Sequence, residues 1–157
     1  MKKKLLLLLS HLLFGIVGFA VGIYALPILT ASKSPSPQAI SSKMSDAKYT
    51  AEFKRSLTDS DLFHWGDGLL SVSERNIAFK GKLAPGPDYR LYLSPKFVDT
   101  EVDFKKHKHQ MTQIASINSF NGFIVNVPED VNISEFNSVI IWCETFGEFI
   151  TAAKYKQ

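Results

Sequence analysis

Cysteine is nearly absent from this sequence: among its 157 residues only Cys143 carries a thiol. A single thiol excludes a framework of intramolecular disulfides and a zinc site built from CxxC pairs. The CxxCH pattern that attaches a c-type haem is missing too, as is any cysteine in the first 30 residues that could carry a lipid. Any role of Cys143 therefore has to come from a single thiol without a second cysteine in the chain.

Catalytic signatures are also missing. The sequence contains no GxSxG, P-loop, GxGxxG or HExxH pattern, and no array of histidines suited to a metal ion. Aspartates lie close to expected turns, where their side chains accept hydrogen bonds from backbone N–H groups; they are Asp59, Asp61, Asp67 and Asp88. We therefore expect a protein that is not an enzyme, with no metal site, and the residues identify no cofactor.

The globular part of the chain has no excess of charge. The formal net charge of +3 is accounted for by Lys2, Lys3 and Lys4, and the other 15 basic residues equal the 15 acidic ones. No basic patch with interleaved aromatic residues is present. Nucleic acid is therefore not an expected partner.

A long apolar run follows the three lysines. Residues 5–29 contain no charged side chain. At about 1.5 Å per residue, residues 5–26 would reach about 33 Å as a helix, enough to cross a hydrocarbon core of about 30 Å. We expect a membrane anchor over residues 1–30. The small residues at 20–22 also fit a signal cleavage site, so removal of the anchor stays open.

The lysines before the apolar run predict its orientation. Basic flanks of a membrane span stay in the cytoplasm. The expected protein is therefore single-pass, with its N-terminus in the cytoplasm and the rest of the chain extracytoplasmic, either periplasmic or extracellular. Residues 31–48 are rich in serine, proline and lysine, which predicts a flexible, solvated linker.

Residues 49–157 have the period-two pattern of β-strands. Tyr89, Leu91 and Leu93 fall on one face of an expected strand. Further strands are expected at 67–74, 76–83, 123–127, 139–143 and 149–155, separated by turns rich in proline, glycine and aspartate. Residues 97–116 are expected to form a loop or one short helix. The pattern predicts a mainly β, antiparallel sandwich-like domain.

The strand at 139–143 is apolar on both faces. Val139, Ile141 and Cys143 share one face, whereas Ile140 and Trp142 share the other. A strand of this kind is expected in the middle of a sheet that is covered on both sides.

Two segments of the domain resemble a known family. Gly86-Pro87-Asp88, followed by Leu91-Tyr92-Leu93-Ser94, is similar to the GPDL-x-V-Y-L-S motif of the DM-thirteen, or electron-transfer DM, domain family. The ending Val139-Ile140-Ile141-Trp142-Cys143, with Phe146, Phe149 and Ala152, is similar to that family's V-x-I-W-C-x-x-F ending. His64 to Gly68 resembles its strand entry. Tyr89 stands where the family has leucine. The resemblance covers about residues 50–155.

The resemblance implies an extracytoplasmic β-sandwich. In multidomain members of the family the domain accompanies DOMON and membrane cytochrome modules, and a redox role has been attached to its cysteine. Cys143 is therefore the redox candidate, and a membrane redox protein is an implied partner. His64 and Trp142 are each a possible ligand or structural partner at the site.

The residues themselves leave two interpretations of Cys143 open. It ends an apolar strand and precedes Glu144, whose charge would raise the thiol pKa if it lay close, and both features favour a buried, inert thiol. An unpaired thiol in an oxidising compartment instead favours a redox or ligand role. The first interpretation predicts a non-catalytic β-sandwich for binding or structural support at the cell surface. The second predicts an accessory to electron transfer.

Overall fold

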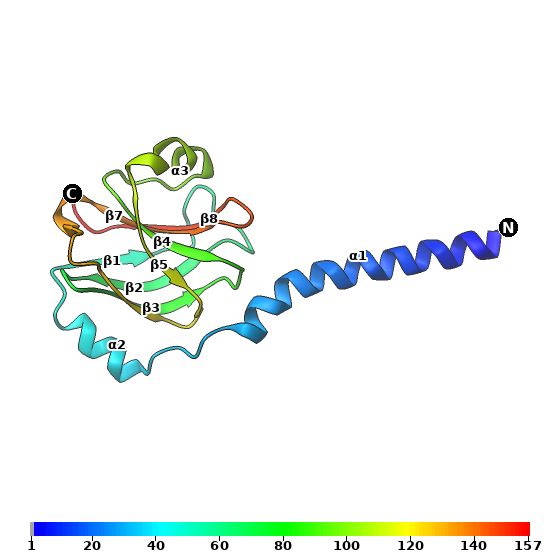
Figure 1. The fold of residues 1–157 in the computed structure, drawn as a ribbon, viewed down its shortest axis with the longest axis horizontal. Coiled ribbons are helices and arrows are strands. Elements are labelled where there is room, and N and C mark those ends of the chain that lie inside the picture. The colour runs from blue at the N-terminus through cyan, green and yellow to red at the C-terminus, as the bar shows by residue number, and fades with distance from the viewer. Residues whose placement is uncertain (1) are drawn as a thin grey trace.

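The computed structural model describes residues 2–157 and begins with one long helix, α1 (Lys2–Thr30). The helix is long and apolar enough to cross a membrane, and its most apolar stretch is exposed rather than packed on the rest of the chain. Figure 1 shows α1 projecting from one end of the folded domain. The expected N-terminal apolar helix is therefore present.

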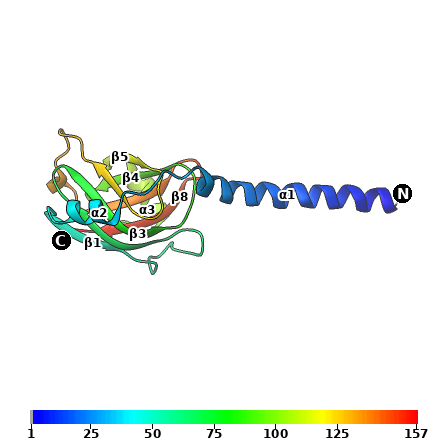
Figure 2. The same cartoon turned by 90° about the horizontal axis from the view of Figure 1, so that it is seen from below.

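The rest of the chain forms two antiparallel sheets of four strands each, in the orders β1-β2-β3-β6 and β5-β4-β7-β8. The two sheets face one another as layers (Figures 1 and 2). This confirms the predicted mainly β, antiparallel sandwich. The strands are β1 (Tyr49–Phe53), β2 (Gly66–Val72), β3 (Asn76–Leu83), β4 (Tyr89–Ser94), β5 (Thr112–Ile117), β6 (Phe123–Asn126), β7 (Ser138–Cys143) and β8 (Glu148–Lys154).

The main core lies between the two sheets. Tyr89, Leu91 and Leu93 all point into it from β4, as their alternation predicts. From the other sheet, Phe79 contacts Phe53 and Phe123 with ring centroids 5.2 Å apart in each pair. Each fully buried side chain of this size contributes about 1.5–3 kcal/mol, so this aromatic row is a large part of what holds the sheets together.

A second, smaller core covers the outer face of β7. Ile140 and Trp142 pack there beneath α3 (Glu101–His107), whose Phe104 is fully buried. Thr100 caps the helix by accepting a hydrogen bond from the backbone N–H of Asp103. β7 is therefore an inner strand buried on both faces, as its sequence indicates.

The region 97–116 contains more regular structure than the sequence indicates. Helix α3 is followed by a short 3₁₀ helix, η1 (Lys108–Gln110), and then by β5. The expected loop or single short helix therefore omitted a strand. β5 lies at the edge of its sheet and is mostly partly exposed, so it has little apolar alternation to identify it. A second 3₁₀ helix, η2 (Ile133–Glu135), precedes β7.

The flexible linker predicted for residues 31–48 is wrong as a description of the whole segment. Helix α2 (Pro37–Met44) lies within it, and Ser36 caps this helix by accepting a hydrogen bond from the N–H of Ala39. Ile40 is buried, and α2 packs against β2, β3 and β6. One apolar residue, a serine cap and a proline in the first turn are enough to hold this short helix against the domain.

Candidate functional site at the end of the sandwich near α1

The register of β4 and β7 brings the two family-like segments together. Cys143, the last residue of β7, lies opposite Tyr89, the first residue of β4. Gly86, Pro87 and Asp88 come immediately before β4, so they lie beside Cys143. The Cys143 thiol donates a hydrogen bond to the Pro87 carbonyl with an Sγ–O distance of 3.0 Å. The backbone N–H of Glu144 donates to the Asp88 carbonyl at 3.1 Å.

The turn of Gly86, Pro87 and Asp88 has a tight local geometry. Asp88 has φ 52°, a left-handed conformation that aspartate adopts more readily than most residues. Its carboxylate accepts a hydrogen bond from the Thr145 hydroxyl at 3.2 Å and pairs with Arg90. A Cβ at Gly86 would lie 2.3 Å from the Tyr89 hydroxyl oxygen, so only glycine fits without displacing that ring. The turn is therefore packed to fit Tyr89 and Cys143.

Cys143 is a neutral thiol in this environment. Its side chain is 2 % exposed. Burial raises its pKa, and the negative charges of Asp88 and Glu148 act in the same direction, whereas the backbone N–H groups of Phe146 and Thr145 oppose them. The acidic neighbours that act on the thiol are therefore Asp88 and Glu148.

Glu144, which the sequence singled out, is engaged elsewhere. Its carboxylate accepts hydrogen bonds from the Lys108 ammonium group at 2.7 and 2.8 Å and from the Tyr92 hydroxyl. Although partial burial opposes the change, these contacts lower the pKa of Glu144. Glu144 thus stabilises the outer face of the sheet rather than tuning Cys143.

A cavity of about 380 Å³ lies between the end of α1 and the sandwich, and Cys143 and His64 both line it. Its other walls come from α1, from the turn before β4 and from the β7–β8 hairpin; they include Ala20, Ile23, Tyr24, Phe63, Pro85, Phe146, Glu148 and Ile150. The walls are predominantly apolar. The structure thus brings Cys143 and His64 to one cavity.

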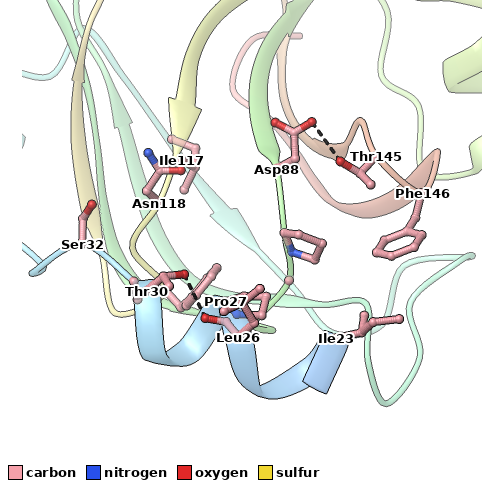
Figure 3. Close-up of a pocket in the computed structure, with 14 residues that line it drawn as sticks. Ile23, Leu26, Pro27, Thr30, Ser32, Asp88, Ile117, Asn118, Thr145 and Phe146 are labelled. Atoms are coloured by element: carbon pink, nitrogen blue, oxygen red, sulfur yellow. Dashed lines mark hydrogen bonds between the residues drawn. The ribbon is translucent and has the colours of Figure 1, made fainter. Parts of the chain in front are cut away.

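A neighbouring cavity of about 410 Å³ shares the Pro87 turn (Figure 3). Ile23, Leu26 and Pro27 of α1 form one side of it, and Asp88 and Phe146 lie on the other. Figure 3 shows the Asp88–Thr145 hydrogen bond above the last turns of α1. The turn of Gly86, Pro87 and Asp88 therefore borders a cavity on each side, at the end of the domain near α1.

His64 is held by its own turn. Its Nδ1 donates to Oδ2 of Asp61 at 3.0 Å, and Asp61 Oδ1 also accepts the backbone N–H groups of Phe63 and His64 at 2.7 Å. Partial burial opposes the change, but these hydrogen bonds lower the pKa of Asp61. In residues 2–157, no cluster of three or more His, Cys, Asp or Glu side chains suited to a metal ion was found. His64 is thus a cavity-lining residue with a defined turn role.

Trp142 does not reach the cavity. It points to the opposite face of β7 from Cys143 and stacks on Phe104 with ring centroids 3.9 Å apart and planes 11° apart. The structure therefore makes Trp142 a packing partner of α3, and its candidacy as a ligand beside Cys143 is corrected.

Several cavity residues carry no sequence motif. The rings of Tyr24 and Phe63 meet edge to face, 6.1 Å apart, although one lies in α1 and the other in the β1–β2 loop. Glu148 also lines the cavity; burial raises its pKa, and a hydrogen bond with Glu101 acts in the same direction. Only the three-dimensional contact between the helix end and the domain identifies these residues, because none of them belongs to a spacing pattern.

The fold and the site define an antiparallel β-sandwich preceded by a long apolar helix, with a cysteine and a glycine-proline-aspartate turn meeting at the end near α1. The chain belongs to the electron transfer DM13 family, whose model matches residues 52–155. This confirms the family resemblance. Searches of the curated proteins and of the solved structures found no match.

Proposed function

We propose that this protein is a membrane-anchored, extracytoplasmic accessory to electron transfer that acts through Cys143. The family match supports an electron-transfer context. The observation that carries the proposal is that Cys143 and His64 line one cavity at the end of the domain where α1 enters. A membrane-embedded redox protein approaching along α1 would reach this end of the domain first.

The domain would lie outside the cytoplasm and would assist a separate redox enzyme. Lys2, Lys3 and Lys4 favour a cytoplasmic N-terminus, which would export the domain and its single thiol. The described residues offer no catalytic constellation around the cavity, so the chain would assist a redox enzyme rather than act as one. Nucleic acid has no role in the proposal.

One observation favours a second function, a non-catalytic binding or structural module at the cell surface. The Cys143 thiol is buried, donates a hydrogen bond to the Pro87 carbonyl and has a raised pKa, all of which suit a structural thiol. In this alternative the cavity would bind a partner and the sulfur would not exchange electrons.

The test compares membranes from cells that naturally make the protein with membranes from the same cells after deletion of its gene. The expected result is a slower electron flux between a membrane donor and its acceptor after deletion, restored by the full-length protein. The purified full-length protein is also analysed for visible absorbance and for metal. An unchanged flux, together with a colourless and metal-free protein, would favour the binding module.

A further inference from the structure

We propose that the end of the domain near α1 lies on the membrane itself, with three apolar side chains inserted at the boundary between lipid headgroups and acyl chains. These are Leu62 and Phe63 in the β1–β2 loop and Phe146 in the β7–β8 hairpin, called here the lipid-facing loops. The inference goes beyond electron transfer and depends on α1 being a membrane span.

The position at which the loops meet α1 sets their depth in the membrane. A hydrocarbon core of about 30 Å corresponds to about 20 helical residues, so a span that begins at Leu5 reaches the far boundary near Tyr24. Phe63 packs on Tyr24. Phe146 and Phe63 also line one cavity together with Ala20, which lies one turn deeper. Because Phe63 contacts Tyr24 and Phe146 lines the cavity beside Ala20, these two loops lie at the membrane boundary.

The three apolar side chains of the lipid-facing loops are exposed. Leu62 is 86 % exposed, Phe63 58 % and Phe146 51 %. Large apolar side chains that gather on one exposed surface mark an interaction site, whereas isolated ones are ordinary. Figures 1 and 2 show α1 leaving the sandwich at the end where the β7–β8 hairpin turns. Phe63 and Phe146, which line one cavity with α1, thus lie on the side from which α1 emerges, and Leu62 precedes Phe63 in the same loop.

Trp65, with Arg55 over its ring, lies beside the next turn of α1, farther from its N-terminus than Tyr24. Trp65 lines a cavity with Ile28, one helical turn beyond Tyr24. The Arg55 guanidinium lies 3.3 Å from the centre of the Trp65 ring. Tryptophan and tyrosine are enriched where membrane meets water, and an arginine beside the ring can reach phosphate groups. The order of apolar loops followed by Trp65 and Arg55 matches the change from lipid tails to headgroups.

Two acidic side chains at this end pair with basic groups, which lowers their cost near lipid. Asp61 accepts its hydrogen bond from His64, and Glu101 accepts one from Lys105 at 2.9 Å. Glu148 lies beside Glu101 instead, and its raised pKa makes its neutral form easier to reach than that of an ordinary carboxyl group. The occupant best suited to the lipid-facing loops is therefore a bilayer surface, held in place by α1, rather than a separate soluble protein.

The test is site-directed spin labelling of the full-length protein in phospholipid vesicles. Cys143→Ser provides a cysteine-free background, and single cysteines are introduced as Leu62→Cys and Phe146→Cys. Leu69→Cys is the matched control, because Leu69 is 54 % exposed on β2 but lies opposite Glu52 and Lys80 in the sheet. Leu13→Cys reports on the middle of α1. The measurement is the ratio of spin-label accessibility to oxygen and to a water-soluble nickel chelate.

The expected result is a shift of the ratio at positions 62 and 146 away from that of position 69 and toward that of position 13. If position 13 is lipid-accessible but 62 and 146 match 69, the lipid-facing loops are disproved and the anchor stands. If position 13 is itself water-accessible, α1 does not span the membrane. Both the lipid-facing loops and the proposed membrane anchor are then overturned.

Discussion

Cys143 and Pro87 are joined by a hydrogen bond from the thiol to the backbone carbonyl, across the junction between β7 and the turn that precedes β4. This contact connects the cysteine directly to the glycine-proline-aspartate turn, the other segment shared with the family. It also gives the sulfur a specific partner in the resting protein. Any redox role of Cys143 has to begin from a protonated and hydrogen-bonded thiol.

The first prediction concerns the reactivity of this thiol. Burial raises the pKa of Cys143. The reactive thiolate should therefore form only at a pH above the pKa of an ordinary cysteine thiol, which is about 8.5. Maleimide should therefore label the folded protein slowly at neutral pH and rapidly once it is unfolded. A protein carrying Leu69→Cys as well supplies an exposed thiol for comparison. Equal labelling rates at the two sites in the folded protein would refute the buried thiol.

The same raised pKa predicts a pH dependence of stability. The folded protein holds the Cys143 proton more tightly than the unfolded chain does, so its contribution is complete below about pH 8.5, the unfolded pKa. That contribution is lost as the pH rises through the folded pKa. Urea unfolding in detergent between neutral and alkaline pH should show a steeper loss of stability for the native protein than for Cys143→Ser, which does not titrate. Identical slopes would contradict the prediction.

Removal of the Phe104 ring should destabilise the domain without touching the cavity. Phe104 is fully buried and stacks on Trp142, so Phe104→Ala should cost about 3–5 kcal/mol of unfolding free energy. Val102→Ala on the same helix is the control, since Val102 is 75 % exposed and its loss should cost under about 0.5 kcal/mol. Urea unfolding measures both. Similar costs for the two variants would show that α3 is not docked on Trp142.

Ile40 tests whether α2 is part of the domain. If α2 is held on the sheet as the structure shows, Ile40→Ala should cost about 2–5 kcal/mol. Gln38→Ala, at an exposed position of the same helix, should change stability very little. A flexible linker would give no difference between the two variants in urea unfolding.

The two-residue alternation of apolar side chains was sufficient to predict most of the sandwich. β4 places Tyr89, Leu91 and Leu93 on one face, and β7 is apolar on both faces, so its inner position could be predicted too. β5 could not, because an edge strand with partly exposed residues has no strong pattern. α2 was missed because its docking depends on one residue, Ile40, in an otherwise polar segment.

For the site, the sequence supplied the residues but not their arrangement. Cys143 and the turn at Gly86, Pro87 and Asp88 could be selected through the family resemblance. Their contact depends on the register between Tyr89 and Cys143, which involves two strands distant in the chain. The residue next to Cys143 in sequence, Glu144, begins the turn between β7 and β8, and its carboxylate pairs with Lys108 instead.

The most direct test of the central claim compares electron flux in membranes that carry the native protein or Cys143→Ser. Serine keeps a donor for the Pro87 carbonyl and removes only the sulfur, and Leu69→Ser controls for an unrelated substitution. In membranes of cells that lack the protein, we expect the native protein and Leu69→Ser to restore the electron flux and Cys143→Ser to leave it low. Full restoration by Cys143→Ser would contradict a role of Cys143 in electron transfer.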